Sequence, residues 1–520
     1  MGFPTADKAD ICLLLEGTFP FVSGGVSSWV NQMIRGFPEY TFACCFIGSR
    51  PEDYGSMKYE LPDNVVHLET HYLHNLQRGA EKRPMKGDAC AYEKVGQFHE
   101  LVKSGKHPEQ KVAMLEEIVS ELGDGKKLSE DSFMRSRASW DYISRCYREQ
   151  SRDPSFVDYF WTVRIMHSPI WALNDIADNL IPAKVYHTIS TGYAGFLGAL
   201  LKHRTGRPLL LSEHGIYTKE RKIDLFQSEW IRDNRGLVEK NNAEMAYFRE
   251  KWVNFFTELG KQCYLASDQI VALYERNRER QVLDGAPAVR TCNIPNGIDL
   301  PRLEKVREAR GDEVPKVACL IGRVVPIKDV KTFLRAMRTV VNDIPDAQGW
   351  IAGPEDEDSE YAQECRGLVA SLGLEKNVKF LGFQKIDTLL PRVGVLVLSS
   401  ISEALPLVIL EGFAAGVPTV STDVGSCRQL IEGLGPEDEA LGKAGEIVGI
   451  ADPEGLGKAV TRLLTDKPAW VAAQQSGIRR VEALYTQELM FSRYRKLYRR
   501  LMARSGAVEQ AAQTQQGGRR

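Results

Sequence analysis

Short apolar runs, bounded by glycine, proline or polar turns, alternate along this chain with longer segments of helical periodicity. Such alternation is typical of βαβ units and parallel sheets, so the pattern predicts an α/β fold. In the first half, the apolar runs predict strands at Ile11–Leu15, Tyr40–Ile47, Val65–Leu68, Val185–Thr188, Leu209–Ser212 and Gln269–Ala272.

A second series of apolar runs begins after residue 316 and indicates a second doubly wound domain. The predicted strands are Val317–Ile321, Gly349–Ala352, Val378–Phe380, Val393–Leu398 and Thr419–Ser421. We therefore expect a first domain at residues 1–300 and a second at residues 315–485. The polar stretch Asp299–Pro315 fits the link between them, and a cleft between the domains is the default ligand site.

Three other segments complete the predicted organisation. Residues from about 86 to 183 have mostly helical patterning, which indicates an α-helical insertion in the first domain. Residues 486–505 predict a C-terminal helix whose aromatic face packs back on the first domain, while its arginine-rich face could meet an anionic membrane surface. The tail at residues 506–520 is rich in glutamine, alanine and glycine and is expected to be disordered.

Charge and cysteine usage exclude several classes of protein. The 520 residues hold 67 Lys and Arg against 69 Asp and Glu, so the chain lacks the overall positive field of a nucleic-acid binder. Ten cysteines without a C-x-x-C pair are typical of a reduced compartment. With neither a signal-like start nor a run of ~18 apolar residues, a cytoplasmic location is expected.

Two candidate binding elements follow strands of the first domain. Gly24 and Gly25 lie between the first predicted strand and a helix, where backbone N–H groups can approach a phosphate or sugar. An ordinary glycine turn explains this pair equally well. His214 ends the strand Leu209–Ser212, and the carboxyl ends of parallel strands face the ligand crevice. A structural histidine is the alternative there.

The second domain carries two cations and two carboxylates after its strands. Arg323 and Lys328 follow the strand Val317–Ile321, where they could clamp a diphosphate; two surface cations are the alternative. Glu403 and Glu411 follow the strand Val393–Leu398 at a spacing of eight positions. Glu403 is expected in the loop and Glu411 in the next helix, where it could bind vicinal hydroxyls as acidic residues do with ribose. The apolar residues around Glu411 disfavour its free solvation.

Together these elements resemble the retaining GT-B glycosyltransferases of family four. The resemblance covers nearly the whole chain and includes the Gly-Gly loop, His214, Pro295-Asn296-Gly297-Ile298-Asp299, Gly322-Arg323 with Lys328, and the Glu403/Glu411 pair. Residues 16–29 and Ser212–Asp224 are also similar to the glycosyltransferases of Pel exopolysaccharide synthesis. The resemblance implies two Rossmann-like domains that face a central cleft.

The resemblance also implies a role for each candidate residue. Gly24 and Gly25 would approach the diphosphate and acceptor, His214 would line the sugar pocket, and Arg323 and Lys328 would hold the diphosphate. Glu403 would contact hydroxyls of the donor sugar, and Glu411 would hold the ribose. The main chain at Gly382, Phe383 and Gln384 would meet the base, and the loop with Leu405 and Leu407 would meet phosphate. Asp329 and Ala404-Leu405-Pro406 depart from the residues usual in the family, so the identity of the donor sugar stays open.

The activity implied is transfer of a hexose or N-acetylhexosamine from a UDP-sugar to a growing polysaccharide. The nucleotide sugar is then a donor substrate, and neither a separate cofactor nor a metal is expected. Subunits of an inner-membrane polysaccharide synthase are the expected partners, with peripheral attachment to that membrane.

Other activities compete with transfer. Asp356-Glu357-Asp358 could form a D-x-D metal site, although proline and acidic residues also mark a helix start. The chain could also be a catalytically silent nucleotide-sugar-binding or scaffold subunit, because fold does not certify activity. A dehydrogenase is disfavoured because no G-x-G-x-x-G follows a first strand.

Overall fold

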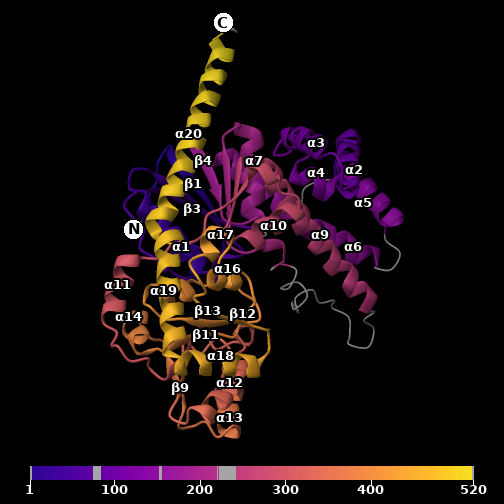
Figure 1. Cartoon of the computed structure of the whole chain (residues 1–520). Coiled ribbons are helices and arrows are strands. Elements are labelled where there is room, and N and C mark those ends of the chain that lie inside the picture. The colour runs from indigo at the N-terminus through magenta and orange to yellow at the C-terminus, as the bar shows by residue number, and fades with distance from the viewer. Residues whose placement is uncertain (1–2, 74–83, 151–154, 220, 222–241, 518–520) are drawn as a thin grey trace. The chain divides into compact units, whose positions relative to one another are not determined.

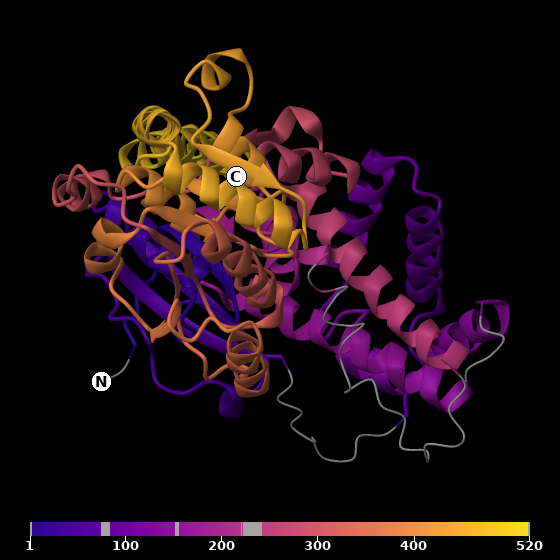
Figure 2. The same ribbon diagram turned by 60° about the horizontal axis from the view of Figure 1, so that its bottom comes forward.

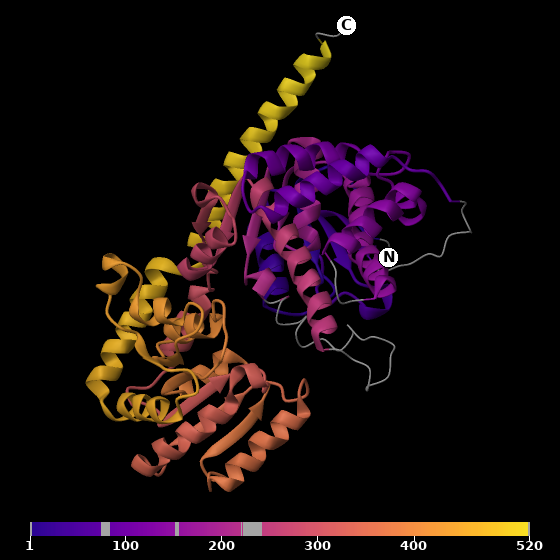
Figure 3. The same cartoon turned by 90° about the vertical axis from the view of Figure 1, so that its right-hand side faces the viewer.

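The computed structural model describes residues 3–73, 84–150, 155–219, 221 and 242–517. The chain divides into two compact units. Unit 1 holds residues 1–272, 278–293 and 494–520, and unit 2 holds residues 273–277 and 294–493. Each unit is built on its own parallel sheet, as Figures 1 and 3 show.

Unit 1 contains a seven-stranded sheet in the order β3-β2-β1-β4-β5-β6-β7. Its strands are β1 (Ala9–Glu16), β2 (Phe42–Gly48), β3 (Val65–Tyr72), β4 (Ala183–Thr188), β5 (Leu209–Glu213), β6 (Gln269–Ala272) and β7 (Thr291–Asn293). All neighbouring strands pair in parallel. The six strands predicted from the apolar runs are confirmed. The edge strand β7 was not predicted, because its three half-buried residues form no apolar run.

Helices pack against this sheet. The helices next to it in the chain are α1 (Gly25–Gly36), α7 (Tyr193–Thr205), α9 (Asn242–Ala266) and α10 (Glu275–Leu283). Helix α7 is buried continuously from Tyr193 to Leu201, and it packs with β1 and β4 in the largest core of this unit.

The predicted helical insertion is confirmed between β3 and β4. It consists of α2 (Ala89–Lys103), α3 (Pro108–Ser120), α4 (Glu130–Arg135), α5 (Arg137–Gln150) and α6 (Phe156–Asn179). Figures 1 and 2 show these helices gathered in one group beside the sheet. Phe133, Phe160 and Trp171 contribute to their shared core.

Unit 2 contains a six-stranded parallel sheet in the order β10-β9-β8-β11-β12-β13. Its strands are β8 (Val317–Ile321), β9 (Gln348–Ala352), β10 (Val378–Gly382), β11 (Val395–Leu398), β12 (Thr419–Thr422) and β13 (Gly445–Val448). Its helices are α11 (Leu300–Glu308), α12 (Val330–Asp343), α13 (Ser359–Ser371), α14 (Ile386–Leu389), α15 (Leu407–Ala414), α16 (Cys427–Glu432), α17 (Pro436–Glu439), α18 (Pro453–Thr465) and α19 (Lys467–Leu484). The five predicted strands are confirmed, and β13 is an additional edge strand.

Two segments differ from the sequence expectation. The stretch Asp299–Pro315 is not only a linker, because it contains α11, which belongs to unit 2. Asp299 caps this helix, and Leu303 and Val306 are buried on its inner face. At the other end, α20 runs over Gln487–Gly517, so residues 506–517 are helical where disorder was expected. An alanine- and glutamine-rich tail has sufficient helix propensity to continue an existing helix.

Helix α20 packs on unit 1 through a buried aromatic network. The Tyr498 hydroxyl lies 2.8 Å from His187 Nδ1, and His187 Nε2 lies 2.9 Å from Ser212 Oγ. Ser212 Oγ is in turn 2.9 Å from the Tyr494 hydroxyl. Because these four residues are all buried, the hydrogen bonds fix one register of the helix against β4 and β5.

Candidate functional site

The candidate donor site is placed by a reversal in the strand order of unit 2. The chain runs from β8 outward to β9 and β10, then returns to pair β11 with the other side of β8. At such a point the loops after the two central strands diverge and leave a crevice at their carboxyl ends. The loop at residues 322–329 follows β8, and the loop at residues 399–406 follows β11. These two loops carry Arg323, Lys328 and Glu403.

Lys328 and Glu403 contact each other across this point. Lys328 Nζ lies 2.6 Å from Glu403 Oε1, and the same oxygen accepts a hydrogen bond of 2.7 Å from Ser400 Oγ. The side chains are 22% and 13% exposed, so the ion pair is only partly solvated. The sequence assigned these residues to different parts of a donor, and the structure brings them together.

The loop of Glu403 is held by two neighbouring segments. Ser399 Oγ donates to the carbonyl oxygens of Lys328 and Asp329 at 2.9 and 3.0 Å, which ties the β11 loop to the β8 loop. On the other side, Gly425 has a φ of 53°, and a Cβ there would lie 2.2 Å from the Glu403 carbonyl oxygen. Only glycine fits this position. Gly425 was not recognised from the sequence, because a single glycine after a strand does not by itself indicate a binding site.

Arg323 is placed differently from Lys328. Its guanidinium group pairs with Glu357 at 2.5 Å, and its side chain is 52% exposed. Asp358, in the same acidic stretch, caps α13 by accepting from the Tyr361 N–H at 3.0 Å. This capping confirms the helix-start interpretation of the stretch Asp356-Glu357-Asp358.

Asp329, which stands where glycine is common in the family that the chain resembles, has a backbone conformation that favours glycine. Its φ of 43° and ψ of 54° are left-handed, a region that aspartate tolerates better than most side chains. Its carboxylate caps α12 through the Thr332 N–H at 3.2 Å. The departure from glycine therefore preserves the loop that presents Lys328.

Glu411 lies in the second turn of α15, inside a small charged cluster. Arg302 Nη2 is 3.5 Å from Glu411 Oε1, and Arg302 Nε is 3.3 Å from Asp387 Oδ1. Burial raises the pKa of Glu411 to about 7; Arg302 lowers it and Asp387 raises it further. The apolar residues that surround Glu411 in the sequence thus keep its carboxyl group poorly solvated, and this burial raises its pKa.

The remaining donor-side residues follow β10 and β11. Gly382 has a φ of 62°, Phe383 is 80% exposed, and Gln384 Nε2 donates to the Leu381 carbonyl at 2.7 Å. Leu405 is buried beneath the loop, whereas Leu407 is 36% exposed at the start of α15. Contact of the main chain at residues 382–384 with the base stays a prediction.

A cavity of about 430 Å³ lies at the carboxyl ends of β1, β2, β4 and β5 in unit 1. It is lined by Glu16, Gly17, Thr18, Val26, Ile47, Gly48, Ser49, Tyr54, Leu73, Ile189, Ser190, Tyr193, His214, Gly215, Tyr217 and Arg221. Gly24 and Gly25 begin α1 close by in the chain and are not among the lining residues. The cavity therefore unites His214 with residues that the sequence analysis did not select.

His214 is buried beside this cavity. Its ring lies 4.5 Å from that of Trp29, and within the described residues its Nε2 atom has no hydrogen-bond partner. Desolvation lowers the pKa of His214 to about 4, so the imidazole is neutral at neutral pH. A buried neutral nitrogen without a partner is available to a hydroxyl group of a ligand.

Glu16 and Glu213 are functional candidates that sequence reasoning missed. Glu16 accepts from Tyr217 Oη at 3.0 Å and from the Ala194 N–H at 3.1 Å. Glu213 is fully buried and accepts from Tyr264 Oη at 2.7 Å and from Gln281 Nε2 at 3.0 Å. Each residue directly follows a predicted strand and is the last residue of the observed strand, β1 or β5, and a carboxylate at that position was the available signal.

Ser212–Asp224, quoted for the Pel resemblance, is only partly described. Residues 222–224 and Glu220 lie outside the described residues. Tyr217 is ordered by the contacts of Glu16 and by the Glu213 carboxylate, which accepts the Tyr217 N–H at 3.1 Å.

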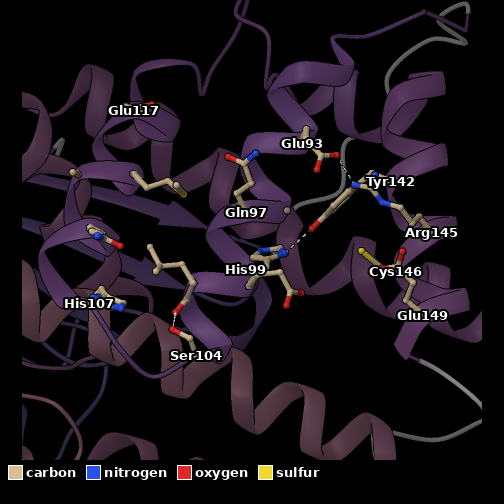
Figure 4. Close-up of a pocket in the computed structure, with 16 residues that line it drawn as sticks. Glu93, Gln97, His99, Ser104, His107, Glu117, Tyr142, Arg145, Cys146 and Glu149 are labelled. Atoms are coloured by element: carbon tan, nitrogen blue, oxygen red, sulfur yellow. Dashed lines mark hydrogen bonds and ion pairs between the residues drawn. The ribbon is translucent and has the colours of Figure 1, made fainter.

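The helical insertion has a separate hollow of about 880 Å³ between α2, α3 and α5 (Figure 4). His99 Nδ1 lies 2.7 Å from the Tyr142 hydroxyl at its wall, and Arg145 pairs with Glu93. None of the candidate donor or acceptor residues lines it. The volume of a cavity alone therefore does not identify the candidate site.

Comparison with known proteins gives the family. Residues 9–289 match the family described as Domain of unknown function (DUF3492). The chain belongs to this family. In this DUF3492 chain, residues 302–480 also match Glycosyl transferases group 1. That second match contains Arg323, Lys328, Glu403 and Glu411, which places the donor-side candidates in a glycosyltransferase-type domain.

Two curated relatives are similar to this chain over part of their length. An exopolysaccharide phosphotransferase of Streptomyces coelicolor is 33% identical over 209 residues, which are 39% of this chain and 20% of that protein. The lipopolysaccharide core biosynthesis glycosyltransferase LpsE of Rhizobium meliloti is 29% identical over 183 residues, or 35% of this chain and 49% of that protein. The chain thus spans a fifth and about half of these relatives.

The fold is supported by solved structures. HepE of Anabaena, in complex with UDP and glucose, aligns with a TM-score of 0.53 at 13% identity and covers 94% of this chain and 99% of HepE. Together with the two Rossmann-like sheets, this likeness confirms the predicted GT-B fold class. The predicted cleft between the units stays a prediction. Among the helices of the described residues, none combines the length and apolar character needed to cross a membrane.

Proposed function

We propose that this protein is a retaining glycosyltransferase that moves a hexose or N-acetylhexosamine from a UDP-sugar to a growing exopolysaccharide. The observation that carries the proposal is the gathering of Lys328, Glu403 and Arg323 on the loops after β8 and β11, inside the region that matches Glycosyl transferases group 1. HepE, a structural neighbour, is described in complex with UDP and glucose.

In the proposed reaction, Lys328 and Arg323 bind the diphosphate oxygens and stabilise the charge that develops as the diphosphate leaves. Glu403 accepts hydroxyl groups of the transferred sugar, and Glu411 accepts the ribose hydroxyls. The bond between the anomeric carbon and the phosphate oxygen breaks, and the acceptor oxygen bonds to the same face of that carbon. The acceptor's proton passes to the departing diphosphate, so no enzyme nucleophile is needed.

The acceptor is proposed to bind on the unit 1 side. The cavity beside Glu16 and His214 offers a carboxylate, a neutral imidazole nitrogen and tyrosine hydroxyls, which suit the hydroxyl groups of a sugar chain. The Gly24–Gly25 backbone would approach the diphosphate and acceptor. The two glycines keep the role that the resemblance implies, whereas His214, which the resemblance places in the sugar pocket, is proposed to contact the acceptor.

The finer identity proposed is a PelF-type enzyme of Pel exopolysaccharide synthesis, acting in the cytoplasm with inner-membrane synthase subunits as partners. Residues 16–29 and 212–224 support it by their resemblance. No resident cofactor is proposed, and no metal is assigned to the transfer.

One experiment tests the activity. Purified full-length protein is incubated with UDP-glucose, UDP-N-acetylglucosamine or UDP-N-acetylgalactosamine and an oligosaccharide acceptor, with and without excess chelator. The expected result is release of UDP that depends on one donor, persists in chelator and is lost in Lys328→Ala. An α-linked product from an α-linked donor, seen by NMR, would support retention, and an inverted product would overturn it.

The scaffold alternative predicts a different outcome. A catalytically silent subunit would bind UDP-sugar with measurable affinity and release no UDP with any donor or acceptor, even with membranes that contain the synthase partners. Calorimetry beside the release assay therefore separates binding without turnover from a failure to bind.

A further inference from the structure

We propose that unit 1 holds a zinc-class divalent ion between β2 and β3, bound by Cys45, Glu69 and His71. The thiol sulfur, a carboxylate oxygen and an imidazole nitrogen of these residues all lie within 4.8 Å of one another. The site is separate from the residues assigned to sugar transfer, so it stands independently of the proposed function.

The strand register explains why these three side chains meet. Cys45 is the direct partner of Glu69, and Ile47 is the partner of His71. Side chains alternate between the two faces of a strand, so Glu69 and His71, two positions apart, project on the same side of β3. Cys45 projects on that side from the neighbouring strand. Two ligands at alternate positions and a third across the sheet converge on one point.

Glu69 has ion-pair contacts at 3.4–3.5 Å with His71 and His67, and these long contacts leave its oxygens without a short hydrogen bond from any protein group that the structure describes. Within the described residues, Glu69 Oε1 and His71 Nε2 are buried and have no hydrogen-bond partner. These two atoms lie 3.4 Å apart, within ion-pair distance of each other, so an ion placed between them would take the place of this contact. Buried polar atoms without partners are rare in native proteins and need an explanation, which a bound ion supplies.

His67 provides independent support from the next alternate position of β3. It is only 8% exposed, and its Nδ1 accepts the Ala6 N–H at 3.3 Å. A neutral ring therefore carries its proton on Nε2, which lies 3.5 Å from Glu69 Oε2 and is itself buried without a hydrogen-bond partner among the described residues. A histidine aimed at a ligating carboxylate is typical of the outer shell of a metal site, where it fixes the orientation of the ligand.

The chemistry of the donors selects the ion. One sulfur, one nitrogen and one oxygen suit Zn²⁺ and related transition metals, whereas Mg²⁺ and Ca²⁺ prefer oxygen alone. On binding, the Cys45 S–H bond breaks, a sulfur–metal bond forms, and the proton is released to the buffer. Glu69 binds as a carboxylate and His71 through the free electron pair of Nε2. Cys45 is fully buried, while the side chains of Glu69 and His71 are 25% and 31% exposed.

Cobalt substitution of the full-length protein is the direct test. Protein stripped with a chelator and dialysed is titrated with Co²⁺, with circular dichroism to verify folding. We expect one equivalent per chain, a near-ultraviolet thiolate-to-cobalt charge-transfer band, visible bands of tetrahedral intensity, and loss of both on addition of Zn²⁺. A folded protein that takes up no Co²⁺, or takes it up without the thiolate band, would overturn the proposal.

Matched variants assign the ligands. Cys45→Ser should abolish the charge-transfer band, whereas Cys44→Ser, a change at an equally buried cysteine on the opposite face of β2, should retain it. His67→Ala should weaken Zn²⁺ about 10–100-fold and keep the band, as expected of an outer-shell residue. A band that survives Cys45→Ser and disappears in Cys44→Ser or Cys12→Ser would place the thiolate elsewhere and refute this site.

Discussion

Lys328 Nζ and Glu403 Oε1 lie 2.6 Å apart, so the cation assigned to the donor diphosphate and the carboxylate assigned to the donor sugar form one ion pair. The pair is mostly buried, and removing one partner of such a pair leaves an uncompensated charge. A diphosphate that binds Lys328 would replace Glu403 as its counter-charge and free this carboxylate for sugar hydroxyls. If these two roles hold, the pair would couple phosphate binding to sugar binding.

The first prediction concerns the two cations. Lys328→Ala and Arg323→Ala should each remove most transfer activity and weaken UDP much more than uridine, because both side chains are assigned to phosphate oxygens. Calorimetry with UDP and uridine measures the difference. Lys331→Ala is the matched control, since Lys331 lies in the next helix and pairs with Glu364 at the surface.

An equal loss of UDP and uridine affinity in Lys328→Ala would contradict the diphosphate role. A loss that Glu403→Gln restores in the double variant would instead indicate that the unpaired carboxylate, and not the missing phosphate contact, was responsible.

The second prediction concerns Glu411. Its assignment to ribose requires the ionised carboxylate, and its pKa is raised to about 7 by burial. Uridine affinity should therefore rise with pH through about 7 in the unmodified protein and stay flat in Glu411→Gln. Loss of a charged hydrogen bond costs about 1.5–3 kcal/mol, so Glu411→Ala should weaken uridine about tenfold or more. Unchanged affinity in a folded variant would remove the ribose assignment.

Sequence patterns predicted the fold well and the local charge pairing poorly. All predicted strands were found, because buried parallel strands are read directly from their apolar runs. The strands β7 and β13 were missed, since short edge strands lack such runs. Period and spacing placed Glu403 in a loop and Glu411 in a helix. The ion pairs of Lys328 and Arg323 depend on which loops meet in three dimensions, and the pattern of residues along the chain does not reveal those distances.

The residues missed in unit 1 show the same limit. Glu16 and Glu213 each end a strand that the sequence did predict, but their importance comes from hydrogen bonds to residues far along the chain, such as Tyr217 and Tyr264. The same limit applies to the proposed metal site of Cys45, Glu69 and His71. The alternation of His67, Glu69 and His71 was visible, whereas the parallel register that adds Cys45 was not.

The third prediction is a pH dependence of stability from Glu213. Its pKa is raised from 4.5 to about 7, chiefly by desolvation. At pH 5–6 the folded state therefore holds a proton on Glu213 that the unfolded state has released, so the contribution of Glu213 to the free energy of unfolding falls as pH rises from about 4.5 to 7. A difference of one pKa unit between the folded and unfolded states changes the free energy of unfolding by about 1.4 kcal/mol. The contribution of Glu213 is therefore of order 3 kcal/mol.

Urea unfolding of the full-length protein at pH 5 and pH 8 measures this effect. Glu213→Gln should remove the part of the difference between pH 5 and pH 8 that Glu213 contributes, whereas Glu100→Gln, a change at an exposed carboxylate, should leave that difference unchanged. An identical pH dependence in the unmodified protein and in Glu213→Gln would show that Glu213 is ionised throughout this range.

The last prediction concerns α20, in which Ser505 is the last buried residue among those whose side chains the structure describes. Deleting residues 507–520 should leave the melting temperature unchanged, whereas truncation after Thr486 should lower it and reduce solubility, because Tyr494, Tyr498 and Leu501 are fully buried. Tyr498→Phe isolates one contact: it removes the hydrogen bond to His187 and should cost about 1 kcal/mol, while Tyr498→Ala should cost about 3–5 kcal/mol.

Several basic side chains of α20 already contact unit 1, and these contacts affect how strongly the helix can bind an anionic membrane. Arg495 pairs with Glu39 at 2.7 Å, Arg504 lies 3.8 Å from Asp268, and Arg500 hydrogen-bonds Gln269, all in unit 1. These contacts reduce the charge available to lipid headgroups. We therefore expect flotation with anionic liposomes at low salt to be weak and to increase in Glu39→Gln, which frees Arg495. Strong, salt-sensitive flotation of the unmodified protein would show that the remaining basic side chains suffice for attachment.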